Sequence, residues 1–280
     1  MNKVLIFLFL LIYSCDTGNL TIVTDLPRTL DEVSGTETVS NSDLIWMLND
    51  SGNKAKIYGL NKKGNIEKEI KINTKNNDWE DFTSDKKGNL YIGDFGNNLN
   101  RRTNLVILKI DKLALAKNSK IDADRILFKY PNQTAFPPKK ESMHFDCEAF
   151  FYFKGNLYLF TKSRVKRQFG RTNLYKISAT PGFHVAEYIN SFDACGASSC
   201  WITSADISDD GQIVTLLSPK SVFTFTQFIN DDFFSGSVKQ YDFSTLSQKE
   251  GVCFKTNNIL YITDEKAHGE GGNLYEFKLD

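Results

Sequence analysis

Acidic residues recur along the chain, each at the start of an apolar segment with the composition of a β-strand. They lie in the stretches DEVSG, DWEDF, DCEAF, SADIS and KEGVC, and are Glu32, Glu80, Glu148, Asp206 and Glu250. Carboxylates held close together cannot all ionise cheaply, so either some of their pKa values rise or a cation binds among them. Such oxygen donors suit calcium, which takes about six to eight oxygen ligands. We therefore predict a calcium site; the alternative is that each acid accepts backbone hydrogen bonds and fixes its own strand.

A second group of polar residues follows the next apolar segment of each repeat. The group consists of Asn49, Asp50, Asp94, Lys162, Ser218, Asp264 and Glu265. Asp50, Asp94 and Asp264 join the five acids above as predicted metal ligands. Lys162 is the single basic residue of the group. We predict that Lys162 and Glu148 are catalytic, because a lysine among acids can hold an anionic group while a carboxylate acts as a base.

Two basic loops follow the second segment in neighbouring repeats, and both end in R-T-N-L. GNNLNRRTN contains Arg101 and Arg102, and KSRVKRQFGRTN contains Arg164 and Arg171. Guanidinium groups beside a cation site would suit a phosphate or another anionic ligand. We predict that these four arginines bind such a ligand; a solvated basic loop is the alternative.

The repeats predict the fold. After each acid the chain passes through a strand, a turn such as Lys-Gly-Asn, and further strands, which gives four strands in each of the first four units and three in the fifth. A repeated unit of about four strands is typical of a β-propeller. The last unit lacks a fourth strand, which NLTIVTDL at residues 19–26 can supply. We predict an all-β propeller of five four-stranded blades closed by that N-terminal strand. A sixth blade involving residues 190–201 and a β-sandwich are the alternatives.

A propeller explains why acids recur at these places. The first strand of each blade lines the central channel, and the loop after the second strand opens on the face where the first strand begins. The two groups of polar residues are therefore expected to converge on one acidic funnel.

The N-terminal stretch MNKVLIFLFLLIYSC has the features of an export signal. Its apolar run is too short to span a bilayer, which needs about 20 residues, but it fits a secretory signal. The ending I-Y-S-C resembles a bacterial lipoprotein signal, in which cleavage leaves a lipidated cysteine. We expect a signal peptide at 1–14, lipidation at Cys15, a tether at 15–19 and the propeller at 20–280, which places the protein in the cell envelope on a membrane anchor. An ordinary signal peptide is the alternative.

Export changes how the other cysteines are interpreted. In an oxidising compartment the stretch CGASSC favours a local disulfide between Cys195 and Cys200. Cys147 and Cys253 stand in apolar surroundings and are expected to be buried thiols, with pairing as the alternative.

Short motifs resemble those of two propeller groups, the SdiA-regulated (YjiK-like) and the phytase-esterase-like proteins. The motifs are EVSG followed by NDSG, then DWED, DCEA, and finally EGV with YITDE. The resemblance implies a propeller of the six-bladed type, an acidic funnel and calcium. A likeness to gluconolactonase-type propellers rests on Glu32 and the acidic ring, but this chain lacks a clear asparagine in the third and fourth units.

Two functions remain open from the sequence. The first is a calcium-dependent hydrolase of a phosphoester or lactone, and the second is a non-enzymatic surface module that binds a glycan or a protein. The chain has 34 basic and 34 acidic residues, and this balance argues against a nucleic-acid partner. We expect a monomer. The sequence predicts that Lys162 is buried among acids if the protein is a catalyst, and exposed to solvent if it is not.

Overall fold

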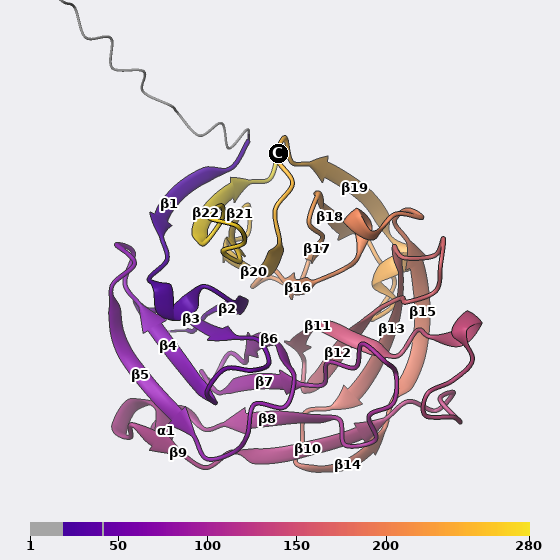
Figure 1. Cartoon of the computed structure of the whole chain (residues 1–280), viewed down its shortest axis with the longest axis horizontal. Helices are drawn as coiled ribbons and strands as arrows, with labels where there is room; N and C mark the ends of the chain where they lie inside the picture. The colour runs from indigo at the N-terminus through magenta and orange to yellow at the C-terminus, as the bar shows by residue number, and fades with distance from the viewer. Residues whose placement is uncertain (1–18, 41) are drawn as a thin grey trace, which may run out of the picture.

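The computed structural model describes residues 19–40 and 42–280. The predicted signal peptide and Cys15 lie outside the described residues. In the described part, five antiparallel sheets stand around a central axis (Figure 1), which confirms the predicted five-bladed β-propeller.

Each sheet is one blade, and in the first four blades the innermost strand comes first in the chain, as predicted. The first blade contains β2 (Val33–Thr38), β3 (Ile45–Asn49), β4 (Lys56–Leu60) and β5 (Ile66–Ile72). The second contains β6 (Trp79–Ser84), β7 (Leu90–Asp94), β8 (Val106–Ile110) and β10 (Asp124–Lys129). The third contains β11 (Asp146–Phe153), β12 (Asn156–Lys162), β13 (Arg171–Ser178) and β15 (Glu187–Asp193). The fourth contains β16 (Ser204–Ile207), β17 (Ile213–Leu217), β18 (Ser221–Thr226) and β19 (Ser237–Asp242).

The fifth blade joins the two ends of the described chain. It contains β20 (Lys249–Thr256), β21 (Ile259–Asp264), β22 (Asn273–Lys278) and, as its outer strand, β1 (Thr21–Asp25). β1 pairs with β22 in antiparallel register, from Thr21 opposite Glu276 to Asp25 opposite Asn273. The N-terminal strand therefore closes the ring, as the sequence predicted.

Contacts between blades rule out both alternative folds. The first strands touch in cyclic order, β2 with β6, β6 with β11, β11 with β16, β16 with β20, and β20 with β2. A sandwich has no such closed cycle. The segment 190–201 completes β15 and continues into a loop, so it does not begin a sixth blade.

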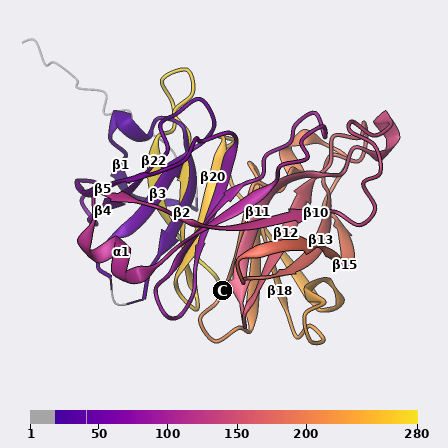
Figure 2. The same cartoon turned by 90° about the horizontal axis from the view of Figure 1, so that it is seen from below.

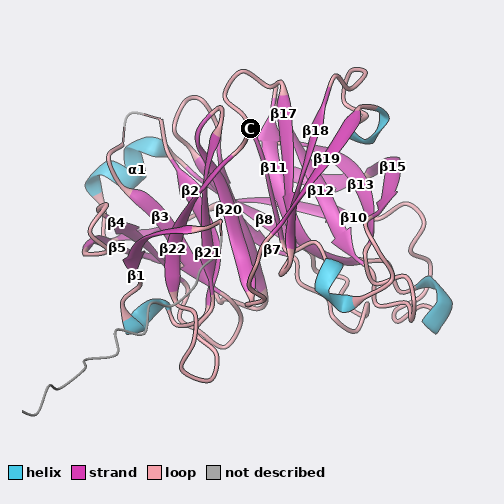
Figure 3. Ribbon diagram, turned by 90° about the horizontal axis from the view of Figure 1, so that it is seen from above, coloured by secondary structure: helices cyan, strands magenta, loops and turns pink. Residues whose placement is uncertain are grey.

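The structure adds two short outer strands that the sequence analysis missed. β9 (Lys120–Ile121) pairs in parallel with β5, and β14 (Gly182–Val185) pairs in parallel with β10, so each extends an earlier blade. Helix is sparse and lies outside the strands (Figure 3). It comprises α1 (Lys112–Lys117) and the 3₁₀ turns Arg28–Leu30, Lys140–Ser142, Ser198–Cys200 and Phe233–Ser235. No helix among the described residues is long and apolar enough to cross a membrane.

The apolar core is divided among the gaps between blades. Five clusters of buried side chains each join two neighbouring blades. Figure 2 shows the sheets of these blades from the side. Aromatic rings fill much of this space; Phe95 and Phe150, from the second and third blades, meet edge to face at 5.1 Å. Such rings bury large apolar areas, which accounts for the high aromatic content of the chain.

Candidate functional site

The first strands run between two ends of the central channel, which we call the acidic mouth and the opposite mouth. The acidic mouth contains Asp50, Asp78, Glu80, Glu148, Lys162, Glu250 and Glu265, which interact electrostatically with one another. The opposite mouth contains Glu37 and Asp206. The predicted ring of acids is thus divided between two places.

Bulges explain which residues reach the acidic mouth. The pairing of first and second strands skips a residue in four blades, at Ser34, at Glu80 or Asp81, at Glu148 and at Glu250. A β-bulge re-aims side chains, and bulges are common beside active sites. Three predicted acids therefore stand at equivalent bulged positions, and the first blade places Ser34, not Glu32, at the fourth.

Asp206 does not reach the acidic mouth, because its strand has no bulge and begins two residues before Asp206, at Ser204. β16 pairs regularly with β17 from Ser204 onward, so Asp206 is carried along the channel. Its carboxylate accepts the backbone N–H groups of Phe254 at 2.7 Å and Ile207 at 2.8 Å. Asp206 thus fixes the fourth blade to the fifth, and it cannot share an ion with Glu80 as the sequence analysis expected.

Three other predicted metal ligands are also absent from the group of carboxylates that gathers at the acidic mouth. Asp94 is buried and accepts hydrogen bonds from Arg102 at 2.8 Å and Asn77 at 2.7 Å. Asp264 is buried and accepts from the Asn273 backbone and the Tyr275 hydroxyl, each at 3.0 Å. Glu32 is exposed at the rim, where Asn53 donates to it. Asp94 and Asp264 therefore stabilise their own blades.

Three carboxylates do gather at the acidic mouth. Oxygen atoms of Asp50, Asp78 and Glu80 all lie within 4.8 Å of one another. Two oxygens bound to one calcium ion at about 2.4 Å each can be at most about 4.8 Å apart, so each pair of these groups is close enough to share one ion. Gly96 leaves room for them, because a side chain there would collide with the carboxylates of Glu80 and Asp78. Asp78 was not predicted, although DWED places it two residues before Glu80.

The raised pKa values of these acids indicate that the cluster lacks enough positive charge to balance its carboxylates. Burial, followed by repulsion from Asp78 and Glu148, raises the pKa of Asp50 to about 6 despite its hydrogen bond from Ser51. Burial and the neighbouring acids Glu148 and Asp50 raise the pKa of Glu80 well above its usual value. A bound divalent cation would relieve both effects.

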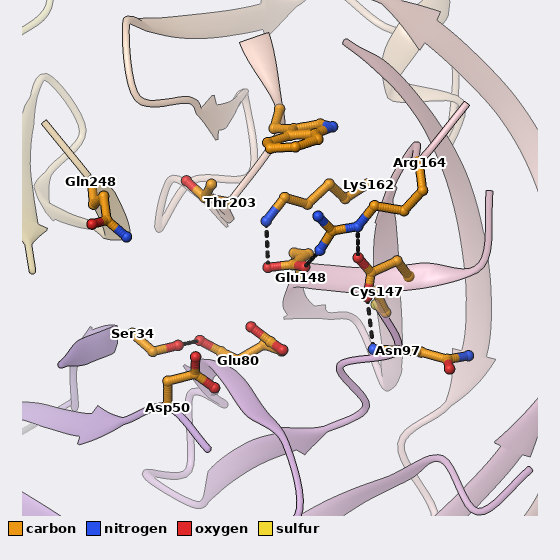
Figure 4. A network of polar contacts seen from close by, with 12 residues as sticks. Ser34, Asp50, Glu80, Asn97, Cys147, Glu148, Lys162, Arg164, Thr203 and Gln248 are labelled. Atoms are coloured by element: carbon orange, nitrogen blue, oxygen red, sulfur yellow. Dashed lines mark hydrogen bonds and ion pairs between the residues drawn. The ribbon is translucent and has the colours of Figure 1, made fainter. Parts of the chain in front are cut away.

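A basic group faces this cluster across the mouth (Figure 4). Lys162 ends β12 and is buried, and its ammonium lies 3.1 Å from Glu148. Arg164 pairs with Glu148 at 3.2 Å and with Asp146 at 2.6 Å. Burial favours a higher pKa for Glu148, but Lys162 and Arg164 outweigh it and lower that pKa. Glu148 and other acids likewise raise the pKa of Lys162 against the effect of burial, so the lysine stays protonated.

Trp201 covers the basic group and was not predicted. Its ring lies 5.2 Å from the ammonium of Lys162 and 4.9 Å from the guanidinium of Arg164. Its indole N–H donates to the carbonyl of Ser163 at 2.7 Å. The structure joins Cys195 and Cys200 in a disulfide directly before Trp201, while Cys147 and Cys253 are buried thiols. The stretch CGASSCW could have indicated that this ring is held in place.

Beside the basic group is a hollow of about 530 Å³. Its lining includes Lys162, Trp201, Thr203, Gln248, Glu250 and Glu265. Burial raises the pKa of Glu250 to about 8 even though Lys162 opposes the shift. Burial and the nearby Asp50 and Glu32 raise the pKa of Glu265 to about 7. The hollow therefore offers a protonated lysine together with carboxyl groups that titrate near neutral pH.

None of the four predicted ligand-binding arginines lines the hollow. Arg102 donates to the carbonyl of Gly96 at 2.8 Å as well as pairing with Asp94. Arg171 pairs with Asp193 at 3.2 Å on the neighbouring strand, and Arg101 is exposed. Of the four, Arg164 pairs with an acid of the acidic mouth, Glu148. Arg102 acts on that mouth through its charge alone, which opposes the effect of burial in raising the pKa of Asp78.

No protein-family model matches the chain, and no curated protein matches its sequence. Several solved structures are similar. Virginiamycin B lyase from Staphylococcus aureus has 14% identity and a TM-score of 0.44, covering 91% of this chain and 69% of that one. A gluconolactonase from Xanthomonas campestris has 10% identity and a TM-score of 0.47, covering 89% and 72%. A nidogen–laminin complex has 12% identity and a TM-score of 0.45, covering 83% and 72%. These similarities are distant, so activity has to be inferred from the site of this chain.

Proposed function

We propose that this five-bladed propeller is a calcium-dependent hydrolase of small anionic substrates, either phosphoesters or lactones that carry an anionic group. One observation carries the proposal: Asp50 and Glu80, which gather with Asp78 in one carboxylate cluster, face the protonated Lys162 across a single mouth (Figure 4). A cation on one side and an ammonium on the other can hold one anionic group between them.

The residues have distinct roles in this proposal. Lys162 binds an anionic oxygen of the substrate, and Glu148 positions Lys162 through their ion pair. Arg164 fixes Glu148 from the other side, so Glu148 stays ionised and is a poor base. Glu265, with its pKa of about 7, is the better base, because a group that titrates near the working pH transfers protons efficiently. A bound calcium ion would polarise the scissile group and acidify a water molecule.

The proposed location is the cell envelope, with a lipid anchor on Cys15. The Cys195–Cys200 disulfide supports an oxidising compartment, where such bonds persist. The resemblance to SdiA-regulated and phytase-esterase-like propellers is part of the same proposal, with five blades as a departure from their six-bladed type.

The second candidate is a non-enzymatic binding module. It is favoured by Asp206, Asp94 and Asp264, whose carboxylates serve the blades rather than a ligand. If Asp50, Asp78 and Glu80 also serve only to stabilise the fold, calcium will not bind to them.

The test begins with calcium titration and thermal unfolding in calcium or in excess chelator. A site at hundredfold excess over its dissociation constant should stabilise the protein by about 2.7 kcal/mol. Glu80→Gln and Asp78→Asn should abolish the shift, whereas Glu67→Gln, on the exposed outer strand β5, should not. p-Nitrophenyl phosphate and a six-membered lactone that carries an anionic group are then tested as substrates with calcium, using Lys162→Met as the inactive variant.

The outcomes separate the two candidates. Calcium stabilisation with turnover that Lys162→Met removes supports the hydrolase. Calcium binding without turnover of either ester supports a binding module, and the absence of any calcium effect rejects the cation site itself.

A further inference from the structure

A second cavity, of about 500 Å³, opens at the opposite mouth. The turns that follow β2, β6, β11 and β16 surround it, so four blades contribute to its rim. Residues that line it include Glu37, Ser40, Tyr152, Phe153, Asp206 and Phe254. None of these residues belongs to the acidic mouth.

The side chain of Asp81 separates the two mouths. It is fully buried, and its carboxylate accepts the backbone N–H of Phe150 at 3.2 Å and the hydroxyl of Ser204 at 3.1 Å. Because these partners belong to the third and fourth blades, Asp81 reaches across the channel from the second. The cavity at the opposite mouth is therefore a separate site.

Two buried acids lie in this cavity on either side of Phe254. Glu37 is 5% exposed and Asp206 is 9% exposed. Each carboxylate oxygen that accepts a backbone N–H retains a second lone pair. Glu37 accepts from Thr38 at 2.7 Å and from Ser84 at 3.0 Å, and Asp206 accepts from Phe254 and Ile207. Both acids can thus accept hydrogen bonds from a ligand while they hold the blades.

The charge balance of the lining favours a cation. Burial, followed by repulsion from Asp206, raises the pKa of Glu37, and burial raises that of Asp206 to about 7. Asp85 is also buried, and its carboxylate already accepts hydrogen bonds from the Asn89 backbone N–H and the Tyr91 hydroxyl. The rim carries three exposed lysines, which Asp209 and Asp210 of the same rim partly offset. Lys86 donates to the Asp209 carbonyl at 2.8 Å, Lys154 lies 4.7 Å from the Phe153 ring, and Lys87 is the third.

Aromatic rings complete the site. Tyr152 and Phe153 come from the end of β11, and Phe254 comes from β20. Such rings bind the apolar body of a ligand and attract a cation over their faces.

We propose that the opposite mouth binds a small primary amine with an apolar or aromatic body. Its ammonium group donates to Glu37 and Asp206, and its body packs against Tyr152, Phe153 and Phe254. This site is independent of the calcium site and of any hydrolysis.

Calorimetric titration of the full protein with 2-phenylethylamine tests the proposal, with phenylacetate as the matched anion. We expect saturable binding of the amine and at least about tenfold weaker binding of the anion, as expected for a charge-assisted hydrogen bond in a buried site. Glu37→Gln should weaken amine binding by a similar factor. Because Glu37 also holds the backbone, Ser40→Trp provides a second variant, which fills the cavity from an exposed turn position.

Glu80→Gln is the control, since it alters the acidic mouth alone and should leave amine affinity unchanged. A failure of calcium binding therefore does not affect this test. The proposal is overturned if the amine shows no saturable binding, if phenylacetate binds as tightly, or if folded Ser40→Trp binds the amine as well as the unaltered protein.

Discussion

The carboxylate of Asp81, on β6 of the second blade, accepts a hydrogen bond from the hydroxyl of Ser204, on β16 of the fourth blade, at 3.1 Å. The Ser204 oxygen in turn accepts the backbone N–H of Val252 on β20, at 3.0 Å. One buried polar path therefore connects blades that are not neighbours. The axis of the ring is held by hydrogen bonds as well as by the apolar clusters between blades.

Replacing Asp81 with alanine is expected to lower the free energy of unfolding by about 3 kcal/mol or more. The change leaves several buried donors unsatisfied, and each costs about 1–3 kcal/mol. Ser204→Ala should cost less, because Asp81 keeps its backbone donors Phe150 and Ala205. Urea unfolding measures both values, and a larger loss in Ser204→Ala would contradict this role for Asp81.

Lys162→Met is expected to weaken the binding of inorganic phosphate, in the presence of calcium, by at least about tenfold. The lysine is protonated and faces the hollow, so its removal takes away the charge that holds the anion. Lys162→Arg should retain part of the affinity. Calorimetry with phosphate measures the change, and equal affinities in Lys162→Met and the unaltered protein would exclude Lys162 as the anion ligand.

The raised pKa of Glu250 predicts a pH dependence of stability. Its folded pKa is about 8 and its unfolded pKa is about 4.3, so the folded protein holds the proton more tightly. The stability from this group is complete below about pH 4 and is lost as the pH rises through 8, at no more than about 1.4 kcal/mol per pH unit. Glu250→Gln should therefore reduce the stability difference between pH 5 and pH 8. Chelator-treated protein is compared by urea unfolding, and an unchanged difference would show that Glu250 does not titrate in this range.

Removing the disulfide is expected to loosen Trp201 without unfolding the ring. Its loop precedes the indole, and the backbone N–H of Gly170 donates to the carbonyl of Cys195 at 2.8 Å. In a Cys195→Ser, Cys200→Ser double variant, iodide should quench tryptophan fluorescence more strongly. Trp46 and Trp79 are buried and serve as the constant background. Unchanged quenching with an unchanged circular dichroism spectrum would show that the indole hydrogen bond to Ser163 suffices.

The sequence predicted the architecture better than it predicted the site. Blade number, strand order and closure by residues 19–26 follow from the repeated strand-turn pattern, which is local. The position of Asp206 could not be read in the same way, because it depends on whether a bulge is present, and SADIS resembles the bulged stretches in composition. β9 and β14 were missed because they are short and pair with distant strands.

Side-chain partners also required the structure. Arg102 and Arg164 have the same type and similar sequence surroundings, yet Arg102 neutralises Asp94 within its own blade and Arg164 reaches Glu148 at the mouth. Lys162 is buried among acids, the arrangement that the sequence analysis associated with a catalyst.

The pairing of β1 with β22 also concerns the order in which the chain is made. β1 leaves the ribosome before every other strand of the ring, and its partner β22 follows all of them. The ring cannot close on a nascent chain, because the strand that completes it does not yet exist, and joining such distant ends is entropically costly. A chain synthesised in this order therefore keeps an open ring, with the inner and outer edges of the fifth blade unjoined, until β22 has been made.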